Sequence, residues 1–211
     1  MDIAFIGCGQ VGAPLADHLQ RVGHQVTLAV KDLDSTSVKK ALAKNSDLRC
    51  AAPEVAVRGA KVVFLATPFQ AHEAALKSVA HEIRGKILVD CTNPVGANLS
   101  HGLNSLQSGS ERIQSLVPDA KVVKAFTIYG YENFEDPSYP GYQVKPMMMF
   151  CGNDPEAKKV VGELITQLGW QALDVGGLEQ ALHLEHMTLL WVRMVRVNGH
   201  SPNLVWAMLS R

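Results

Sequence analysis

The sequence lacks several features that mark special classes of protein. It has no excess of either charge, because 20 Lys and Arg residues balance 20 Asp and Glu residues over 211 positions. Nothing in its charge therefore favours nucleic acid or an acidic membrane as a partner. No apolar run approaches the roughly 20 residues that a membrane-spanning helix needs. The first residues also lack the basic region and cleavage site of a signal peptide. We expect a cytoplasmic protein with neither a nucleic-acid nor a membrane partner.

Cysteine is scarce as well, and its spacing points to no cross-linked or metal-bound framework. The chain has four cysteines and none of them forms a C-x-x-C pair. Each lies in or beside an apolar stretch, where a free thiol behaves as a small hydrophobic side chain. A reducing compartment is the simplest interpretation.

Groups of residues that are typical of acid–base or metal catalysis are missing too. We find no Ser–His–Asp arrangement, no pair of carboxylates with a reason to act together, and no general base of the kind a hydroxyacid dehydrogenase needs. His183 and His186 flank Glu185 in a helix-like stretch, but two histidines do not complete a zinc site. The sequence therefore predicts neither a catalytic side chain nor a bound metal.

What is present is a regular alternation of strand-like and helix-like segments. Strands are expected at residues 2–6, 24–30, 48–50, 61–67, 86–91, 120–126, 145–152 and 170–175. Helices are expected at residues 10–22, 35–44, 71–83, 110–117, 154–169 and 178–196. Such alternation predicts an α/β protein of the Rossmann type, with a doubly wound parallel sheet and helices on both faces. A short helical extension at the carboxyl end completes it.

No repeat, linker or low-complexity tract divides the chain. We expect a single dinucleotide-binding domain over residues 1–211. Residues 1–150 would form its nucleotide-binding body, and residues 151–211 would extend the sheet and add the terminal helices.

A glycine-rich turn joins the first predicted strand to the first predicted helix. In the stretch GCGQVG, Gly7 permits a tight turn, Gly9 lets the backbone approach a pyrophosphate, and Gly12 lets helix and strand pack closely. Gln10 and Val11 lie in the same turn, where the helix N-terminus offers free N–H groups to phosphates. The alternative is a glycine-rich turn that binds no ligand. The position between strand and helix favours a dinucleotide site.

The end of the second predicted strand bears on the choice between NADP and NAD. An acidic residue there would bind the ribose hydroxyls of NAD, but Lys31 follows the expected strand end. A cation suits the extra phosphate of NADP, and Ser35, Lys39 and Lys40 lie near enough in the sequence to help. If the strand runs further than we expect, Asp32 would instead take the NAD role. We favour NADP(H).

Three further strand ends carry candidate binding residues. In a parallel sheet these ends meet at one edge, where ligands bind. We expect the segment after residue 65 to floor the ribose and nicotinamide, and the segment after residue 90 to hydrogen-bond the ribose or carboxamide. With the end of the strand at residues 120–126, the candidates are Ala66, Thr67, Pro68, Thr92, Asn93, Pro94, Ala125 and Phe126. Thr, Asn and Pro are also common turn residues, so a plain loop is the alternative at each end.

Five stretches carry a resemblance to a known family. They are GCGQVG, FLATPFQAHEAAL, LVDCTNPV, VVKAFT and MMFCGNDPEAKKVVGELITQLGWQALDVGGL. In this order they resemble the deazaflavin-dependent (coenzyme F420-type) NADP oxidoreductases, and also the cytosolic domain of the six-transmembrane ferric reductases. The similarity covers nearly the whole chain.

The resemblance implies an NADPH-binding domain whose short carboxyl-terminal part helps to hold a flat, flavin-like acceptor. It places Lys31 where an arginine usually meets the 2′-phosphate, and His72 where the family often has a histidine near the cofactor. Two positions differ from the family pattern, because Val30 replaces a usual serine and Thr127 replaces a usual asparagine.

Two functions are compatible with these observations. The first is an NADPH-dependent oxidoreductase that transfers a hydride between NADP(H) and a deazaflavin, flavin or ferric chelate. Since both redox centres are small molecules, the protein needs only to bind, orient and exclude water. The second is a non-catalytic NADP(H) sensor.

The carboxyl-terminal stretch also predicts a homodimer. Residues 178–196 are apolar around much of the helix circumference, and Trp191 and Trp206 are typical interface or core anchors. The alternative is that the terminal residues fold back and bury this helix within one subunit.

Overall fold

Eight strands form one sheet in the computed structural model, which describes residues 1–211. Their order across the sheet is β3-β2-β1-β4-β5-β6-β7-β8. The strands are β1 (Asp2–Ile6), β2 (Gln25–Ala29), β3 (Arg49–Ala51), β4 (Val62–Leu65), β5 (Ile87–Asp90), β6 (Lys121–Lys124), β7 (Met147–Gly152) and β8 (Gln171–Asp174). The first six run parallel, which confirms the predicted α/β sheet.

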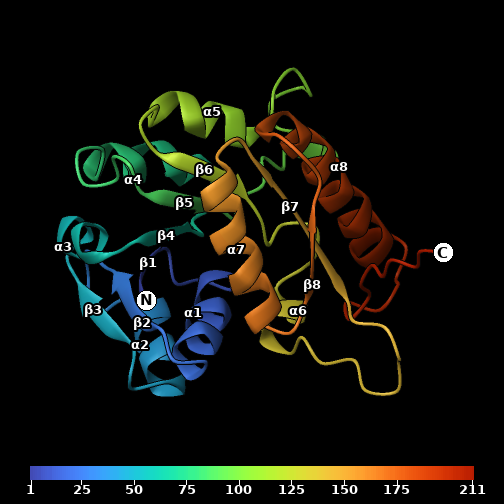
Figure 1. The fold of residues 1–211 in the computed structure, drawn as a ribbon, viewed down its shortest axis with the longest axis horizontal. Helices are drawn as coiled ribbons and strands as arrows, with labels where there is room; N and C mark the ends of the chain where they lie inside the picture. Colours follow the sequence, from blue (N-terminus) through green and yellow to red (C-terminus); the bar gives the residue numbers. More distant parts are fainter.

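Helices cover both faces of this sheet (Figure 1). They are α1 (Gly12–Arg21), α2 (Thr36–Lys44), α3 (Pro53–Gly59), α4 (His72–Ser78), α5 (Gly109–Leu116), α6 (Glu132–Glu135), α7 (Pro155–Gln167) and α8 (Ala181–Val192). Neighbouring side chains of a strand point to opposite faces, so each strand contributes to two cores. In β1, Ile3 shares a core cluster with Leu15 of α1, whereas Ala4 shares another with Val57 of α3.

The sheet departs from the expected parallel arrangement at β7. This strand pairs antiparallel with β6, through Val123 opposite Gly152, and β8 then pairs parallel with β7. Residues 125–146, between β6 and β7, contain only the four-residue helix α6. A parallel return usually runs through a helix packed across one face of the sheet, and α6 is too short to serve as one. Without one, the chain re-enters the sheet from the edge at which it left.

Helix starts follow the sequence signals closely, with one exception in detail. Asp154 accepts a hydrogen bond from the backbone N–H of Ala157 (2.8 Å) and caps α7, as predicted. Ser35 occupies the N-cap position of α2, but its side chain makes no capping bond. Pro14 lies in the first turn of α1, where a helical N–H has no partner within the helix.

Three helices differ from expectation in extent. Helix α3, which starts with Pro53 at its first turn, was not predicted. Helix α4 ends at Ser78, well short of residue 83. The last helix changes to a π-helical turn at Arg193–Val197. None of the helices has the combination of length and hydropathy that a membrane crossing requires.

The carboxyl-terminal residues fold back over α8 and the start of β7. The indole N–H of Trp191 donates to the carbonyl of Leu204 (2.7 Å), and the backbone N–H of Met147 donates to the carbonyl of Trp206 (2.9 Å). Trp191 is thereby buried within its own chain. Leu190 and Leu209 remain exposed, and the homodimer stays a prediction.

Burial of Trp191 predicts a strong dependence of stability on this side chain. We expect Trp191→Ala to lower the free energy of unfolding by about 3–5 kcal/mol, because the change removes a large buried ring and leaves a cavity. Urea denaturation followed by circular dichroism measures the loss. Leu190→Ala is the matched control, since Leu190 is 51% exposed and its loss should change the unfolding free energy by no more than about 0.5 kcal/mol. Equal losses in the two variants would contradict the buried position.

Candidate functional site

The predicted binding segments converge at the carboxyl edge of the sheet. The turns after β1, β2, β4, β5 and β6 all leave this edge, because these strands are parallel. The strand order reverses between β1 and β4. In open α/β sheets, ligands bind in the crevice at such a reversal. The structure thus brings the five predicted segments together, including those that lie more than 100 residues apart.

The glycine turn has the geometry that a close approach requires. Gly7 has φ +99°, and a Cβ at this position would lie 2.7 Å from the backbone of Ala66. A Cβ on Gly12 would lie 2.1 Å from the carbonyl oxygen of Gly7. Gly9 differs from both, because a Cβ there would meet nothing within 4 Å. The protein itself therefore needs Gly7 and Gly12, and leaves open space beside Gly9.

The same turn presents unpaired hydrogen-bond donors. The backbone N–H groups of Gln10, Val11 and Gly12 donate to no group of the protein. These groups lie at the start of α1, where the helix dipole is positive. Gln10 is exposed and Val11 half-buried. Such an array of donors is suited to an anion.

The end of β2 lies where the sequence predicts it. The strand ends at Ala29, and the Lys31 side chain is exposed and forms no ion pair. Asp32 is exposed too, and its Oδ1 accepts the N–H of Asp34 within the same loop (2.9 Å). Ser35 follows at the N-terminus of α2. Lys31 is thus the free charge at this strand end, while the Asp32 carboxylate takes part in a turn.

The segment after β4 is packed against the glycine turn. Ala66 is buried and contacts the backbone position of Gly12, while Pro68 is exposed. The hydroxyl oxygen of Thr67 is buried without a hydrogen-bond partner. His72 is buried at the start of α4, with Nδ1 paired to the carbonyl of Phe69 and Nε2 without a partner. Two orphaned polar atoms therefore lie along this segment.

The residues after β5 are held in place by hydrogen bonds to other parts of the protein. The hydroxyl of Thr92 donates to Asp90 Oδ1 (2.7 Å) and is buried. Asn93 is half-buried, and its Oδ1 accepts the hydroxyl of Thr188 from α8 (3.1 Å). Pro94 is buried beside it. The side chain and backbone of Thr92 are thus committed to the protein, and the half-buried amide of Asn93 is the polar group of this segment that lies nearest the edge.

The segment after β6 contains an unusual backbone conformation. Ala125 and Phe126 are both buried, and Phe126 has φ +55°. This left-handed conformation is uncommon for a residue other than glycine and is often found at functional sites. The Phe126 ring packs on Phe64 of β4, with ring centroids 5.8 Å apart. The strained turn therefore has its side chain in the core and its backbone at the edge.

Sequence reasoning missed a buried charged group at this edge. The ammonium of Lys124 lies 3.1 Å from Asp90 Oδ2 and 2.8 Å from Glu185 Oε1, and also donates to the carbonyl of Thr92 (2.6 Å). His101 contacts the other oxygen of Glu185 at 2.8 Å. We call Asp90, Lys124, Glu185 and His101 the Lys124 cluster. The sequence held one signal for it, a lysine and an aspartate inside otherwise apolar strands.

The environment of Lys124 keeps it charged. Burial alone would lower the pKa of its ammonium, but the carboxylates of Asp90 and Glu185 outweigh burial and hold the pKa above the usual value. Lys124 and Asp90 are 0% exposed, and Glu185 is 1% exposed. Lys124 therefore stays positively charged throughout the neutral pH range.

The histidines beside Glu185 take separate roles. His183 is exposed, and His186 pairs with the hydroxyl of Ser105 (2.9 Å). Glu185 points the other way, into the core, where Gly109 at the N-terminus of α5 donates its N–H to the carboxylate (2.9 Å). The three residues that are close in sequence therefore do not face one another.

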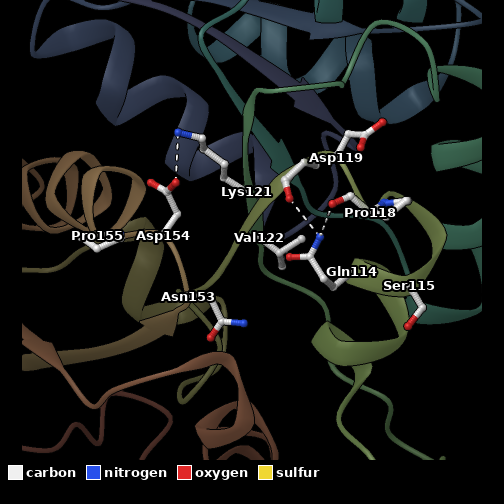
Figure 2. Close-up of a pocket in the computed structure, with 10 residues that line it drawn as sticks. Gln114, Ser115, Pro118, Asp119, Lys121, Val122, Asn153, Asp154 and Pro155 are labelled. Atoms are coloured by element: carbon white, nitrogen blue, oxygen red, sulfur yellow. Dashed lines mark hydrogen bonds and ion pairs between the residues drawn. The ribbon is translucent and has the colours of Figure 1, made fainter.

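A polar pocket of about 520 Å³ lies at the opposite edge of the sheet (Figure 2). It surrounds the amino end of β6 and includes the ion pair of Lys121 with Asp154 (3.0 Å). The side-chain amide of Gln114 donates a hydrogen bond to the carbonyl of Ala120 (2.9 Å). Since Lys121, Asp154 and Gln114 are already paired within the protein and the pocket lies at the edge of the sheet opposite the glycine turn, we do not assign the candidate site to it.

Comparisons with known proteins agree with this architecture. Residues 2–94 match the family model described as NADP oxidoreductase, coenzyme F420-dependent. A crystal structure from Arthrobacter sp. FB24, provisionally described as an F420-dependent NADP reductase, superposes with a TM-score of 0.90 at 30% identity, covering 100% of both chains.

Two curated proteins are also similar over much of this chain. The F420-dependent NADP reductase of Methanocaldococcus jannaschii is 32% identical over 143 residues, which are 65% of this chain and 63% of that protein. The rat metalloreductase STEAP3 is 30% identical over 188 residues, which are 89% of this chain but 36% of that protein. Together with the fold and the turn after β1, these similarities show that the chain belongs to the family of coenzyme F420-dependent NADP oxidoreductases.

Proposed function

We propose that this protein is an NADP-dependent oxidoreductase that transfers a hydride between NADP(H) and a flavin-like acceptor. The observation that carries the proposal is the turn after β1, with free N–H groups at the start of α1 and open space beside Gly9. When bound, NADPH supplies a hydride, which carries one hydrogen nucleus and two electrons to the acceptor and leaves NADP⁺. We propose a deazaflavin or a flavin as the acceptor of this hydride, and a ferric chelate would receive single electrons from the reduced flavin.

The residues at the carboxyl edge fit a dinucleotide in chemical terms. Under the proposal, Gly9, Gln10, Val11 and Gly12 hold the pyrophosphate through their backbone. Lys31, with the hydroxyl of Ser35, pairs with the 2′-phosphate. The orphaned oxygen of Thr67 and the orphaned nitrogen of His72 supply polar partners along the second half of the site.

The position of the nicotinamide half of the site follows from the order of the strands in the sheet. The 2′-phosphate end belongs to β2, on one side of the strand reversal. The nicotinamide end then falls at β4, β5 and β6, beside Ala66, Pro68, Asn93, Pro94, Ala125 and Phe126. Helix α8 reaches this end, since Thr188 donates to the carbonyl of Thr127 (2.8 Å). This contact supports a role of the carboxyl-terminal part in holding the acceptor.

Transfer of a hydride between two small molecules does not require the protein to supply a general acid or a general base. Binding, alignment and exclusion of water supply the rate enhancement. The buried backbone of residues 125–127 and the packed segment after β4 can exclude water from one face of the nicotinamide. The proposed reaction therefore needs no catalytic side chain from the protein.

Turnover with a panel of acceptors tests the proposed function. We expect the protein to oxidise NADPH with at least one of a deazaflavin, FMN, FAD or a ferric chelate, followed by the loss of absorbance at 340 nm. The second candidate is a non-catalytic NADP(H) sensor, which would use the same turn after β1 to bind the cofactor. Tight binding of NADPH without turnover of any acceptor would favour the sensor and contradict the enzyme.

The cation at the end of β2 predicts a preference for NADPH over NADH. We expect Lys31→Ala to reduce this preference roughly ten- to hundredfold, because a charge-assisted contact contributes about 1.5–3 kcal/mol and each 1.4 kcal/mol is tenfold. Titration calorimetry with both cofactors measures it. Lys159→Ala, on the exposed side of α7, is the control and should change nothing. Equal affinity of the wild type for both cofactors would instead favour Asp32 and NAD.

The glycines of the turn predict two distinct mutant phenotypes. Gly9→Val should leave the thermal melting temperature near that of the wild type and abolish NADPH binding, because its side chain enters space that the protein does not use. Gly12→Val should lower the melting temperature as well, because its Cβ would overlap the carbonyl of Gly7. Wild-type NADPH affinity in folded Gly9→Val protein would show that the turn is only structural.

A further inference from the structure

The two carboxylates of the Lys124 cluster accept hydrogen bonds on both of their oxygens. Asp90 accepts the N–H and hydroxyl of Thr92 on one oxygen (2.8 and 2.7 Å), and the hydroxyl of Ser110 and the ammonium of Lys124 on the other (2.6 and 3.1 Å). Each oxygen accepts from one group that can only donate, the N–H of Thr92 on Oδ1 and the ammonium of Lys124 on Oδ2, and the positive charge of the ammonium stabilises the ionised carboxylate. Asp90 is therefore ionised.

Glu185 is ionised for the same reason. Its oxygens accept the ammonium of Lys124, the N–H of Gly109 and the Nε2 of His101. The other ring nitrogen, His101 Nδ1, faces the N–H groups of Leu103 (3.3 Å) and Ser105 (3.2 Å). Since Nδ1 must accept from these donors, the ring carries its single proton on Nε2 and is neutral.

The charges of the cluster do not cancel. Two carboxylates, one ammonium and one neutral imidazole leave one net negative charge, buried away from solvent. The N-terminus of α5, at Gly109, offsets roughly half a charge through its dipole. The field of the cluster therefore remains negative at short range.

The cluster lies directly behind the segment that we assign to the nicotinamide end. Asp90 is the last residue of β5, and both it and Lys124 bind Thr92. Asn93 and Pro94 follow at the edge. Thr92 contacts the cluster directly and is itself only 3% exposed. Salt therefore screens the charges of the cluster only weakly at this point.

We propose that the Lys124 cluster favours the oxidised, positively charged nicotinamide over the reduced, neutral one, and so biases this protein toward giving up hydride from NADPH to its acceptor. The inference rests on the proposed function, since it requires that NADP(H) binds at this edge. It concerns the relative affinity of the two redox forms and the direction of the reaction. The residues act through their charge and do not contact the reacting atoms.

The ratio of two dissociation constants tests the proposal without turnover. Calorimetry gives Kd for NADP⁺ and for NADPH, and their ratio reports the preference between the redox forms. Asp90→Asn and Glu185→Gln each remove one negative charge, and each should raise Kd(NADP⁺)/Kd(NADPH) by about five- to thirtyfold, the effect of one charge across roughly 10 Å of protein. Loss of packing weakens both forms together and leaves the ratio unchanged.

Two controls separate charge from structure. The double variant Asp90→Asn/Lys124→Gln removes one charge of each sign, so its ratio should return to within about twofold of the wild type. Asp119→Asn removes an exposed carboxylate at the opposite edge of the sheet, and its ratio should equal that of the wild type. Circular dichroism identifies the folded variants, and either single variant that folds decides the outcome.

The outcomes are distinct. A raised ratio in a folded single variant, with restoration in the double variant, supports the proposal. An unchanged ratio in the single variants, or an equal rise in the double variant, overturns it while the proposed function stands. If the wild type binds neither NADP⁺ nor NADPH, the proposed function fails, and the inference fails with it.

Discussion

The ammonium of Lys124 is the interaction on which the candidate site depends. It joins Asp90 at the end of β5, the carbonyl of Thr92 and Glu185 of α8 in one buried contact. A charge removed from water is costly unless its partners are close and complete. The end of β5, the end of β6 and α8 are therefore held in one relative position, since any displacement would leave a charge unpaired. Removal of one partner of such a pair typically costs about 3–5 kcal/mol.

A second constraint sets the other half of the site. The backbone of the β1–α1 turn leaves no room for a side chain at two glycines, because Gly7 lies against the backbone of Ala66 after β4 and Gly12 lies against the carbonyl of Gly7. The turn is thus rigid before any ligand arrives. Preorganised N–H groups at a helix start bind an anion without the cost of ordering a loop. Gly9 has open space beside it. The fold alone therefore does not require a glycine at this position, whereas a ligand bound close to the backbone would.

The two constraints share one origin in the topology of the sheet. Parallel strands direct their carboxyl ends to one edge, and the reversal of order between β1 and β4 opens the crevice there. The antiparallel strand β7 then changes the direction of the chain, and α8 follows to reach the ends of β5 and β6 through Glu185 and Thr188. A carboxyl-terminal helix thereby becomes part of a site whose recognisable motif lies at the amino terminus.

The sequence alone determined the α/β alternation, the turn after β1, the end of β2 shortly before Lys31 and the cap at Asp154. These features are local, because each depends on residues within a few positions of one another. Tertiary structure decided the rest. The antiparallel direction of β7 follows from the lack of a crossover helix, which hydrophobic pattern does not encode. The pairing of Lys124 with Glu185 joins residues 61 positions apart, and the commitment of Thr92 to Asp90 appears only once both are buried. Charge pairing across such separations depends on how the elements pack, so no spacing in the sequence could reveal it.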